Sequence, residues 1–321
     1  MNKDDIGISV DFAGIKLANP VLTASGTCGY ADELADFVDI GKLGGFITKS
    51  ITLEPLKGNP TPRIVETDSG MLNSIGLANI GVERFIDEKL PIIKHLGVPV
   101  FVNLAGRTIE EYVAVAEWLA GEDGIAGFEL NISCPNVKEG GITFGTEPGL
   151  VEKITKAVKK VSGAKPLIVK LTPTVADITV TARAAVEAGA DALSLVNTFT
   201  AMVIDIERQE PVLANRTGGL SGPAIKPIAV YLVNKVYNEV AGPSGIGILG
   251  GGGIRTASDA IEFMIAGATA VAVGTATFIE PDRAVRIIDG IRKYCARKDV
   301  SRITELTGCL QLLRFDGKMS L

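Results

Sequence analysis

The chain has 321 residues, 46% of them hydrophobic, with a formal net charge of -5, one histidine and four cysteines. The acidic balance argues against a nucleic-acid-binding surface, which needs a basic stripe. No apolar run reaches the roughly eighteen residues of a membrane span, and the polar N-terminus lacks a signal sequence, so we expect a cytoplasmic protein.

Apolar residues and helix–strand alternation run evenly from residue 1 to residue 321, without a linker-like or low-complexity stretch. We therefore expect a single domain.

The cysteines and the histidine narrow the possible chemistry. Cys28, Cys134, Cys295 and Cys309 show neither paired metal-ligand spacing nor the density of a disulfide scaffold, so no metal site is expected. His95 falls in a predicted helix over residues 85–96 and is assigned a structural role. Proton transfer near neutral pH would then need a carboxylate, a lysine or a thiol.

The first predicted element is a small β-hairpin. Residues 8–10 and 15–17 are the expected strands, joined by residues 11–14. We expect this hairpin to plug one end of the fold.

Short apolar runs then alternate with amphipathic helical patterns. The runs cover residues 21–24, 45–48, 98–102, 128–130, 167–169, 192–196, 247–249 and 270–273. Eight strands with helical crossovers over this length predict an α/β fold, a (β/α)8 TIM barrel.

Polar residues follow six successive strands of the predicted barrel. They are Ser25, Lys49 with Ser50, Asn103, Asn131, Lys170, and Asn197 with Thr198. Because the C-terminal ends of barrel strands meet at one face, these residues predict the floor of a single pocket.

The last two strands end in glycines. Residues 250–253 are all glycine and precede a helix predicted over residues 256–266, and Gly274-Thr275 precedes another helical start. Glycines allow close backbone approach, and N–H groups at a helix N-terminus favour anions, so we expect a phosphate site here.

Two long insertions leave the C-terminal ends of strands, at residues 51–81 and 198–227. We expect both to overhang the pocket. Within the second, residues 202–206 and 210–213 are expected to pair as a ribbon.

The stretch from Asn131 to Asn136 reads Asn-Ile-Ser-Cys-Pro-Asn. Pro135 lacks an N–H and must end the strand, which places Cys134 at the strand edge. With the glycine-containing loop to Pro148, this pattern predicts a reactive thiol on a movable lid, close to the carboxamides of Asn131 and Asn136.

Lysines, carboxamides, a thiol and a phosphate cradle suit flavin mononucleotide (FMN). Two alternatives remain open at this point. One is a flavin-free lyase or aldolase that uses Lys170 or Lys49 as a Schiff base, and the other is a nucleotide-binding regulatory barrel without chemistry.

The motifs together resemble the class 1 dihydroorotate dehydrogenases. They are Asn73-Ser74-Ile75-Gly76-Leu77, Asn131-Ile132-Ser133-Cys134-Pro135-Asn136, Lys170-Leu171-Thr172-Pro173, Gly250 to Ile254, and Gly274-Thr275. The segments at residues 81–85 and 137–141 look most like the class 1B catalytic subunit.

This resemblance implies flavin-dependent oxidation of dihydroorotate to orotate in pyrimidine biosynthesis, with Cys134 as the base that removes the C5 proton while the C6 hydride passes to FMN. The implied substrate-binding residues are Lys49, Asn73, Ser74, Ile75, Gly76, Leu77, Asn131, Asn136, Asn197 and Thr198. The implied FMN-binding residues are Ser25, Lys49, Ser50, Asn103, Asn131, Lys170, Val196, Gly222, Gly252, Gly253, Gly274 and Thr275. Lys170 would face the pyrimidine edge of the flavin.

The resemblance to class 1B also implies a partner subunit that carries FAD and a 2Fe-2S cluster and passes electrons to NAD. The expected assembly is a catalytic homodimer within a heterotetramer. A class 1A-like homodimer that reduces fumarate directly stays open.

A cysteine base has a consequence for pH dependence. An unperturbed thiol has a pKa of about 8.5, so only a few per cent is thiolate at about pH 7. We predict that flavin reduction by dihydroorotate accelerates between about pH 6 and pH 9, measured by stopped-flow absorbance. A flat profile would contradict rate-limiting proton removal by Cys134.

Overall fold

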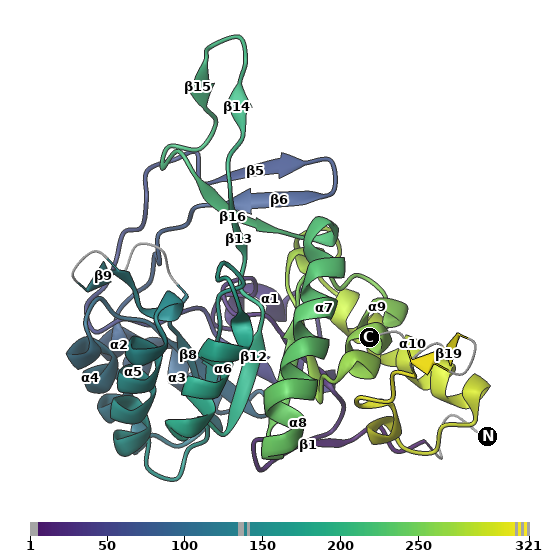
Figure 1. Ribbon diagram of the computed structural model, residues 1–321. Helices are drawn as coiled ribbons and strands as arrows, with labels where there is room; N and C mark the ends of the chain where they lie inside the picture. Colours follow the sequence, from purple (N-terminus) through teal and green to yellow (C-terminus); the bar gives the residue numbers. More distant parts are fainter. Residues whose placement is uncertain (1–5, 134–137, 140–141, 312–313, 316–317, 320–321) are drawn as a thin grey trace.

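The computed structural model describes residues 6–133, 138–139, 142–311, 314–315 and 318–319. Within these residues, a sheet of eight parallel strands forms the centre of the molecule (Figure 1). In sheet order the strands are β3 (Val21–Thr23), β18 (Ala270–Val273), β17 (Gly247–Gly251), β12 (Ala192–Leu195), β11 (Leu167–Lys170), β8 (Gly127–Asn131), β7 (Val100–Leu104) and β4 (Phe46–Ile47).

The two edge strands, β3 and β4, meet and close the sheet into a barrel. Leu22 and Gly45 form a parallel bridge, and the Gly44 N–H donates to the Val21 carbonyl at 2.9 Å. The Thr23 hydroxyl adds a side-chain link, because it accepts from the Ile47 N–H at 2.9 Å. Each predicted strand is present, so the (β/α)8 prediction is confirmed.

Helices pack around the barrel (Figure 1). They are α1 (Asp32–Ala35), α2 (Val82–Arg84), α3 (Leu90–Ile93), α4 (Ile109–Ala120), α5 (Pro148–Val161), α6 (Ile178–Glu187), α7 (Lys226–Val236), α8 (Gly242–Ser244), α9 (Ala257–Ala266) and α10 (Arg283–Lys298). A π-helical turn, Phe85–Lys89, joins α2 to α3. The helix predicted over residues 85–96 thus begins earlier and ends earlier, and His95 lies exposed beyond its end.

The barrel strands are buried on both faces. Every residue of β7 and β8 is buried, as expected for parallel strands whose outer face packs on helices and whose inner face fills the barrel. Phe46, Phe101 and Phe128 are among the largest fully buried side chains. These apolar strands hold the polar strand ends in fixed positions.

The N-terminal hairpin closes the end of the barrel where the strands begin. Strand β1 (Val10–Phe12) pairs with β2 (Ile15–Leu17), and Phe12 packs edge-on against Phe101 with ring centroids 6.3 Å apart. The plug is therefore confirmed. The predicted first strand at residues 8–10 was misplaced, because the turn is the two-residue Ala13-Gly14, both with positive φ, and Asp11 and Phe12 continue the strand.

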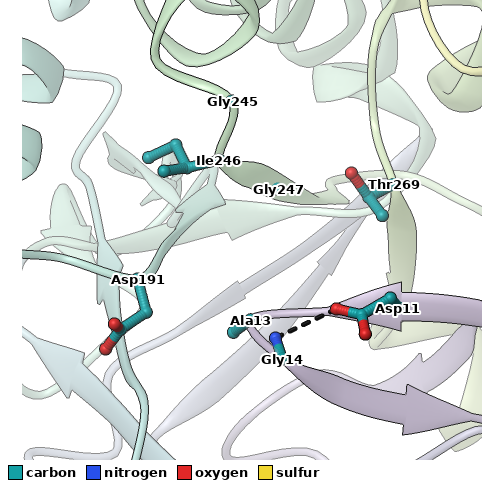
Figure 2. Close-up of a pocket in the computed structure, with 8 residues that line it drawn as sticks. All are labelled: Asp11, Ala13, Gly14, Asp191, Gly245, Ile246, Gly247 and Thr269. Carbon is teal, nitrogen blue, oxygen red and sulfur yellow. Dashed lines mark hydrogen bonds between the residues drawn. The ribbon is translucent and has the colours of Figure 1, made fainter.

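A cavity of about 480 Å³ lies between this hairpin and the starts of neighbouring strands (Figure 2). Two aspartates line it, and both are engaged. The Asp11 carboxylate accepts from the Gly14 N–H at 3.0 Å, and the Asp191 carboxylate accepts from Lys159 Nζ at 2.5 Å. The first contact stabilises the turn, and the Asp191 carboxylate also accepts from the Leu167 N–H at 2.6 Å, which fixes the start of β11.

The two long insertions combine into one antiparallel sheet over the other end of the barrel (Figure 1). We call it the cover sheet, and its strand order is β13 (Phe199–Ala201), β16 (Gly218–Ser221), β6 (Gly70–Asn73) and β5 (Ile64–Thr67). The predicted ribbon is confirmed with shorter strands, β14 (Ile204–Asp205) and β15 (Glu210–Pro211), and projects beyond the cover sheet.

Short hairpins complete the described chain. Strand β9 (Lys138–Glu139) pairs with β10 (Ile142–Thr143), and β19 (Arg314–Phe315) pairs with β20 (Lys318–Met319). Across the described residues, every helix is too short or too polar to cross a bilayer.

The packing of the hairpin predicts that two phenylalanines contribute very differently to the free energy of unfolding. Phe12 is fully buried, whereas Phe37 is 68% exposed. We expect Phe12→Ala to lower the free energy of unfolding by about 3–5 kcal/mol, because it removes a buried ring and leaves a cavity. The matched control Phe37→Ala should stay within about 0.5 kcal/mol of the parent protein. Urea unfolding followed by circular dichroism measures both, and equal losses would contradict the plug.

Candidate active site

The C-terminal ends of the barrel strands and the cover sheet enclose a cavity of about 1470 Å³. A pocket for one drug-sized ligand occupies roughly 300–1,000 Å³. The cavity therefore has room for a cofactor and a small substrate together.

Most residues selected from the sequence line this cavity. They are Ser25, Lys49, Ser50, Asn73, Ser74, Ile75, Gly76, Leu77, Asn131, Lys170, Val196, Asn197, Thr198, Gly222, Gly252, Gly253, Gly274 and Thr275. Cys134 and Asn136 lie outside the described residues. Asn103 differs from the expectation of a pocket floor, because its fully buried side chain lies behind Ser50 and does not reach the cavity.

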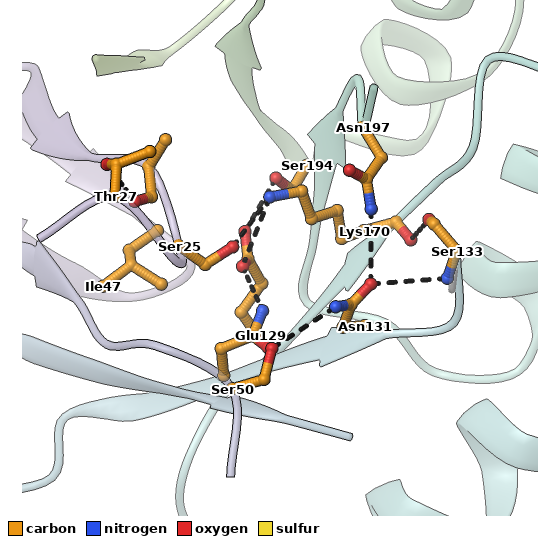
Figure 3. A network of polar contacts seen from close by, with 12 residues as sticks. Ser25, Thr27, Ile47, Ser50, Glu129, Asn131, Ser133, Lys170, Ser194 and Asn197 are labelled. Atoms are coloured by element: carbon orange, nitrogen blue, oxygen red, sulfur yellow. Dashed lines mark hydrogen bonds and ion pairs between the residues drawn. The ribbon is translucent and has the colours of Figure 1, made fainter. Parts of the chain in front are cut away.

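Lys170 lies on the floor of the cavity at the end of β11. Its ammonium donates to the Ser25 hydroxyl at 2.8 Å and lies 3.8 Å from the Glu129 carboxylate (Figure 3). The lysine side chain is 12% exposed and the glutamate side chain 1%. The cation is thus held at the cavity surface by partners from two other strand ends.

Glu129 was missed by the sequence reading. It lies within the run of residues 128–130 that was treated as an apolar strand. The alternation of side chains along a strand could have revealed it. Residues 129 and 131 share one face of β8, and Asn131 was already assigned to the pocket. A carboxylate in a barrel strand, on the same face as a functional residue, should have been included.

The carboxamides of Asn131 and Asn197 meet in the same cavity (Figure 3). Asn197 Nδ2 donates to Asn131 Oδ1 at 3.3 Å, and the Asn197 Oδ1 accepts from the Thr198 N–H at 2.8 Å. The Ser133 hydroxyl donates to the Lys170 carbonyl at 2.8 Å, which ties Ser133 to the end of β11. These contacts orient the amide groups for a planar ligand with donors and acceptors.

The cover sheet brings Asn73 to the same cavity. Asn73 and Gly219 are paired in register between β6 and β16, and Asn73 Nδ2 donates to the Gly219 carbonyl at 3.4 Å. A Cβ at Gly219 would lie 2.1 Å from Thr198 Oγ1. Two segments far apart in the sequence, around Asn73 and around Thr198, therefore pack together across one glycine.

A glycine cradle lies at the ends of β17 and β18. Gly252 and Gly253 have φ values of +123° and +82°, which disfavour any other residue. A Cβ at Gly253 would lie 2.7 Å from the Gly222 carbonyl oxygen. In the described part of the chain, the N–H groups of Gly252 and Gly253 donate to no protein acceptor, so they are available to an anion.

The start of α9 does not supply the anion site that the sequence suggested. The N–H groups of Arg255 and Thr256 donate to the Asp259 carboxylate at 3.0 and 2.9 Å. Thr256 and Asp259 form a capping box, and the Asp259 carboxylate places negative charge at this helix start. The donors left for a phosphate are those of the glycine loops before the helix.

Lys49 supplies a second cation to the cavity. Burial lowers the pKa of its ammonium group, the Glu33 carboxylate acts in the opposite direction, and the Arg63 guanidinium lowers it further. The Lys49 N–H donates to the Gly29 carbonyl at 2.8 Å, which fixes its backbone. A half-buried cation without a short ion pair in the described residues suits a carboxylate ligand.

The glycine cradle, the Lys170 cation and the carboxamides fit a flavin nucleotide: the first for a phosphate, the second for an electron-rich ring edge, the third for ring amides. Within the described residues, histidine, cysteine and acidic side chains do not gather into a group that could hold a metal ion.

Comparisons with known proteins give the family of the chain. A family model described as dihydroorotate dehydrogenase matches residues 7–295. The catalytic subunits of dihydroorotate dehydrogenase B (NAD(+)) from Geobacter sp. strain M21 and Geotalea daltonii are each 54% identical over 312 residues, covering 97% of this chain and 100% of theirs.

A solved structure has the same fold. The dihydroorotate dehydrogenase of Eimeria tenella in complex with ferulenol superposes with a TM-score of 0.78 at 23% identity, covering 94% of this chain and 88% of that one.

The two lysines Lys49 and Lys226 should differ in their titration. Burial lowers the pKa of Lys49, whereas the hydrogen bonds that Lys226 donates to Asp259 and Glu262 raise the pKa of Lys226. We therefore expect Lys49 to become reactive toward acetic anhydride at a lower pH than Lys226, because only the neutral amine reacts. Competitive labelling read by mass spectrometry measures both in one sample. If Lys49 titrated at the same pH as Lys226 or at a higher pH, the account of Lys49 as a half-buried cation without a close ion pair would be contradicted.

Proposed function

The chain belongs to the dihydroorotate dehydrogenase family, and from this premise we propose that the large cavity is the site where it oxidises dihydroorotate to orotate with FMN as cofactor. The observation that carries the proposal is the placement of Lys170 at the floor of a cavity that also contains the glycine cradle. The reaction belongs to pyrimidine biosynthesis, and the enzyme is an oxidoreductase.

The FMN site that we propose uses three sets of residues. The N–H groups of the glycine loops hold the phosphate, Lys170 and Ser25 hold the pyrimidine edge, and Ser50 and Asn131 provide hydrogen bonds to ring atoms. Asn103 acts from behind the cavity wall, because it accepts from the Ser50 hydroxyl at 2.5 Å. When bound, FMN supplies the acceptor for the hydride from the substrate.

The substrate site that we propose lies between Lys49 and the carboxamides. Dihydroorotate is an anion with ring amides and carbonyls. Lys49 pairs with its carboxylate, and Asn73, Asn131 and Asn197 bind its ring. The backbone of residues 74–77 and the Thr198 hydroxyl complete the wall, and Asn136 is included from the sequence motif.

We assign the role of base to Cys134, which removes the C5 proton of the substrate. Support comes from its place in the chain, directly after Ser133, whose side chain is 8% exposed and bonded to the Lys170 carbonyl. Lys170 is already engaged, because it contacts both Ser25 and Glu129. The role itself rests on the sequence motif at residues 131–136, in which a thiol stands beside two carboxamides.

The relatives are named catalytic subunits, which implies a partner subunit. We propose that this partner carries FAD and a 2Fe-2S cluster and delivers electrons to NAD, the acceptor that the names of the relatives give. We further propose a catalytic homodimer within a heterotetramer in the cytoplasm. Because the chain belongs to this family, we set aside the two alternatives that the sequence left open, a flavin-free lyase or aldolase and a regulatory barrel.

An anaerobic titration tests the function directly. The purified protein should show flavin absorbance near about 450 nm that bleaches when dihydroorotate is added. The variant Cys134→Ala should keep its flavin, because the cradle and Lys170 are unchanged, but should bleach at least about a hundredfold more slowly because the base is absent. Stopped-flow absorbance measures both rates.

Two results would contradict the proposal. A colourless wild-type protein that binds no FMN would remove the cofactor assignment. A Cys134→Ala variant that bleaches at the wild-type rate would remove the base assignment while leaving the cofactor in place.

A further inference from the structure

Glu129 has been described so far only as a partner of Lys170, and what it does for the proposed reaction is still to be explained. Its side chain is 1% exposed, and among the described residues it is the only carboxylate in the buried set. Burying an ionised carboxylate is costly unless hydrogen bonds and a cation compensate it. The position therefore needs an explanation beyond packing.

Both oxygens of the Glu129 carboxylate have donors (Figure 3). Asn103 Nδ2 donates to Oε2 at 2.5 Å, and the Ser194 hydroxyl donates to Oε1 at 2.9 Å. The two donors come from β7 and β12, so the carboxylate is fixed from two other strands of the barrel.

The donor Asn103 is itself held in place. Its side-chain oxygen accepts from the Ser50 hydroxyl at 2.5 Å, and its backbone N–H donates to the Thr48 hydroxyl at 3.2 Å. Both of these partners follow strand β4. Glu129 is therefore rigidly mounted, with little freedom to rotate away from the cavity floor.

The charge that Glu129 faces is Lys170. Lys170 Nζ lies 3.8 Å from Glu129 Oε2 and donates to Ser25 Oγ at 2.8 Å. A lysine has a long flexible side chain, so a fixed carboxylate and a hydroxyl beneath it restrict the ammonium to one place. That place is the point where the cavity begins.

We propose that Glu129 is a positioning residue that acts through Lys170: it holds the ammonium at the cavity floor and limits how closely that positive charge approaches the flavin. This inference rests on the proposed FMN site. It adds a residue that does not touch the cofactor or the substrate but sets how readily the bound flavin is reduced.

The direction of the effect follows from Coulomb's law. Reduction places negative charge on the pyrimidine edge of the flavin, which the Lys170 cation stabilises. The Glu129 anion, 3.8 Å from Lys170 Nζ, attracts that cation toward the barrel floor and away from the ring. Removing the anion while keeping the cation should make the bound flavin easier to reduce. Removing the cation should make it harder to reduce.

The test compares Glu129→Gln with the wild type at a fixed redox poise set by a reference dye. Glutamine has nearly the same size and keeps an oxygen for one of the two donors. We expect the variant to retain FMN and to show a ratio of reduced to oxidised flavin about tenfold higher, read from the absorbance spectrum. In the Lys170→Met background, the same Glu129→Gln change should alter the ratio less than about twofold.

The outcomes separate three possibilities. A wild-type protein without FMN overturns the proposed function, on which the inference depends. With FMN present, an unchanged ratio in Glu129→Gln overturns the role of Glu129. An equal shift in both backgrounds overturns the action through Lys170, because it would show a direct field of Glu129 on the flavin.

Folding is checked by circular dichroism for each variant. If Glu129→Gln does not fold but Glu129→Gln/Lys170→Met does and binds FMN, the coupling of the two charges is supported, because removing both restores what removing one destroys. If neither folds, Glu129 has a structural role and the proposal is overturned.

Discussion

The buried pair of Glu129 and Lys170 is the interaction on which the candidate site depends. Barrel interiors are ordinarily filled by apolar side chains, but here a carboxylate that is 1% exposed and an ammonium that is 12% exposed lie 3.8 Å apart. Such a pair persists only with further hydrogen bonds, which Asn103, Ser194 and Ser25 provide. Each of these residues comes from a different strand or strand end, so the closed barrel is what brings them together.

The two ends of the barrel differ in role: one is packed for stability, and the other forms the cavity. At the end where strands begin, the hairpin packs Phe12 against Phe101, and the aspartates nearby are engaged by backbone N–H groups and Lys159. At the other end, polar strand ends and the cover sheet enclose the large cavity. The free energy gained from apolar packing at one end thus offsets the cost of burying polar groups at the other.

The alternation of apolar runs with helical patterns, and the polar residues after each run, made the barrel predictable from the sequence. Short apolar runs between helical patterns gave all the barrel strands, and polar residues after them gave most of the cavity floor. Glu129 was not predicted, because it lies inside an apolar run and its partners Asn103 and Ser194 are adjacent only after the barrel closes. The cover sheet was missed for the same reason, since pairing of β6 with β16 is a long-range contact without a local signal.

The central claim is that the cavity seats FMN with its pyrimidine edge on Lys170 and its phosphate on the glycine loops. A crystal structure of the purified protein with orotate tests it most directly. The account predicts FMN with its pyrimidine edge within hydrogen-bonding distance of Lys170 Nζ, its phosphate on the N–H groups of Gly252 and Gly253, and the orotate carboxylate on Lys49. A flavin phosphate bound elsewhere, or a ring edge away from Lys170, would contradict it.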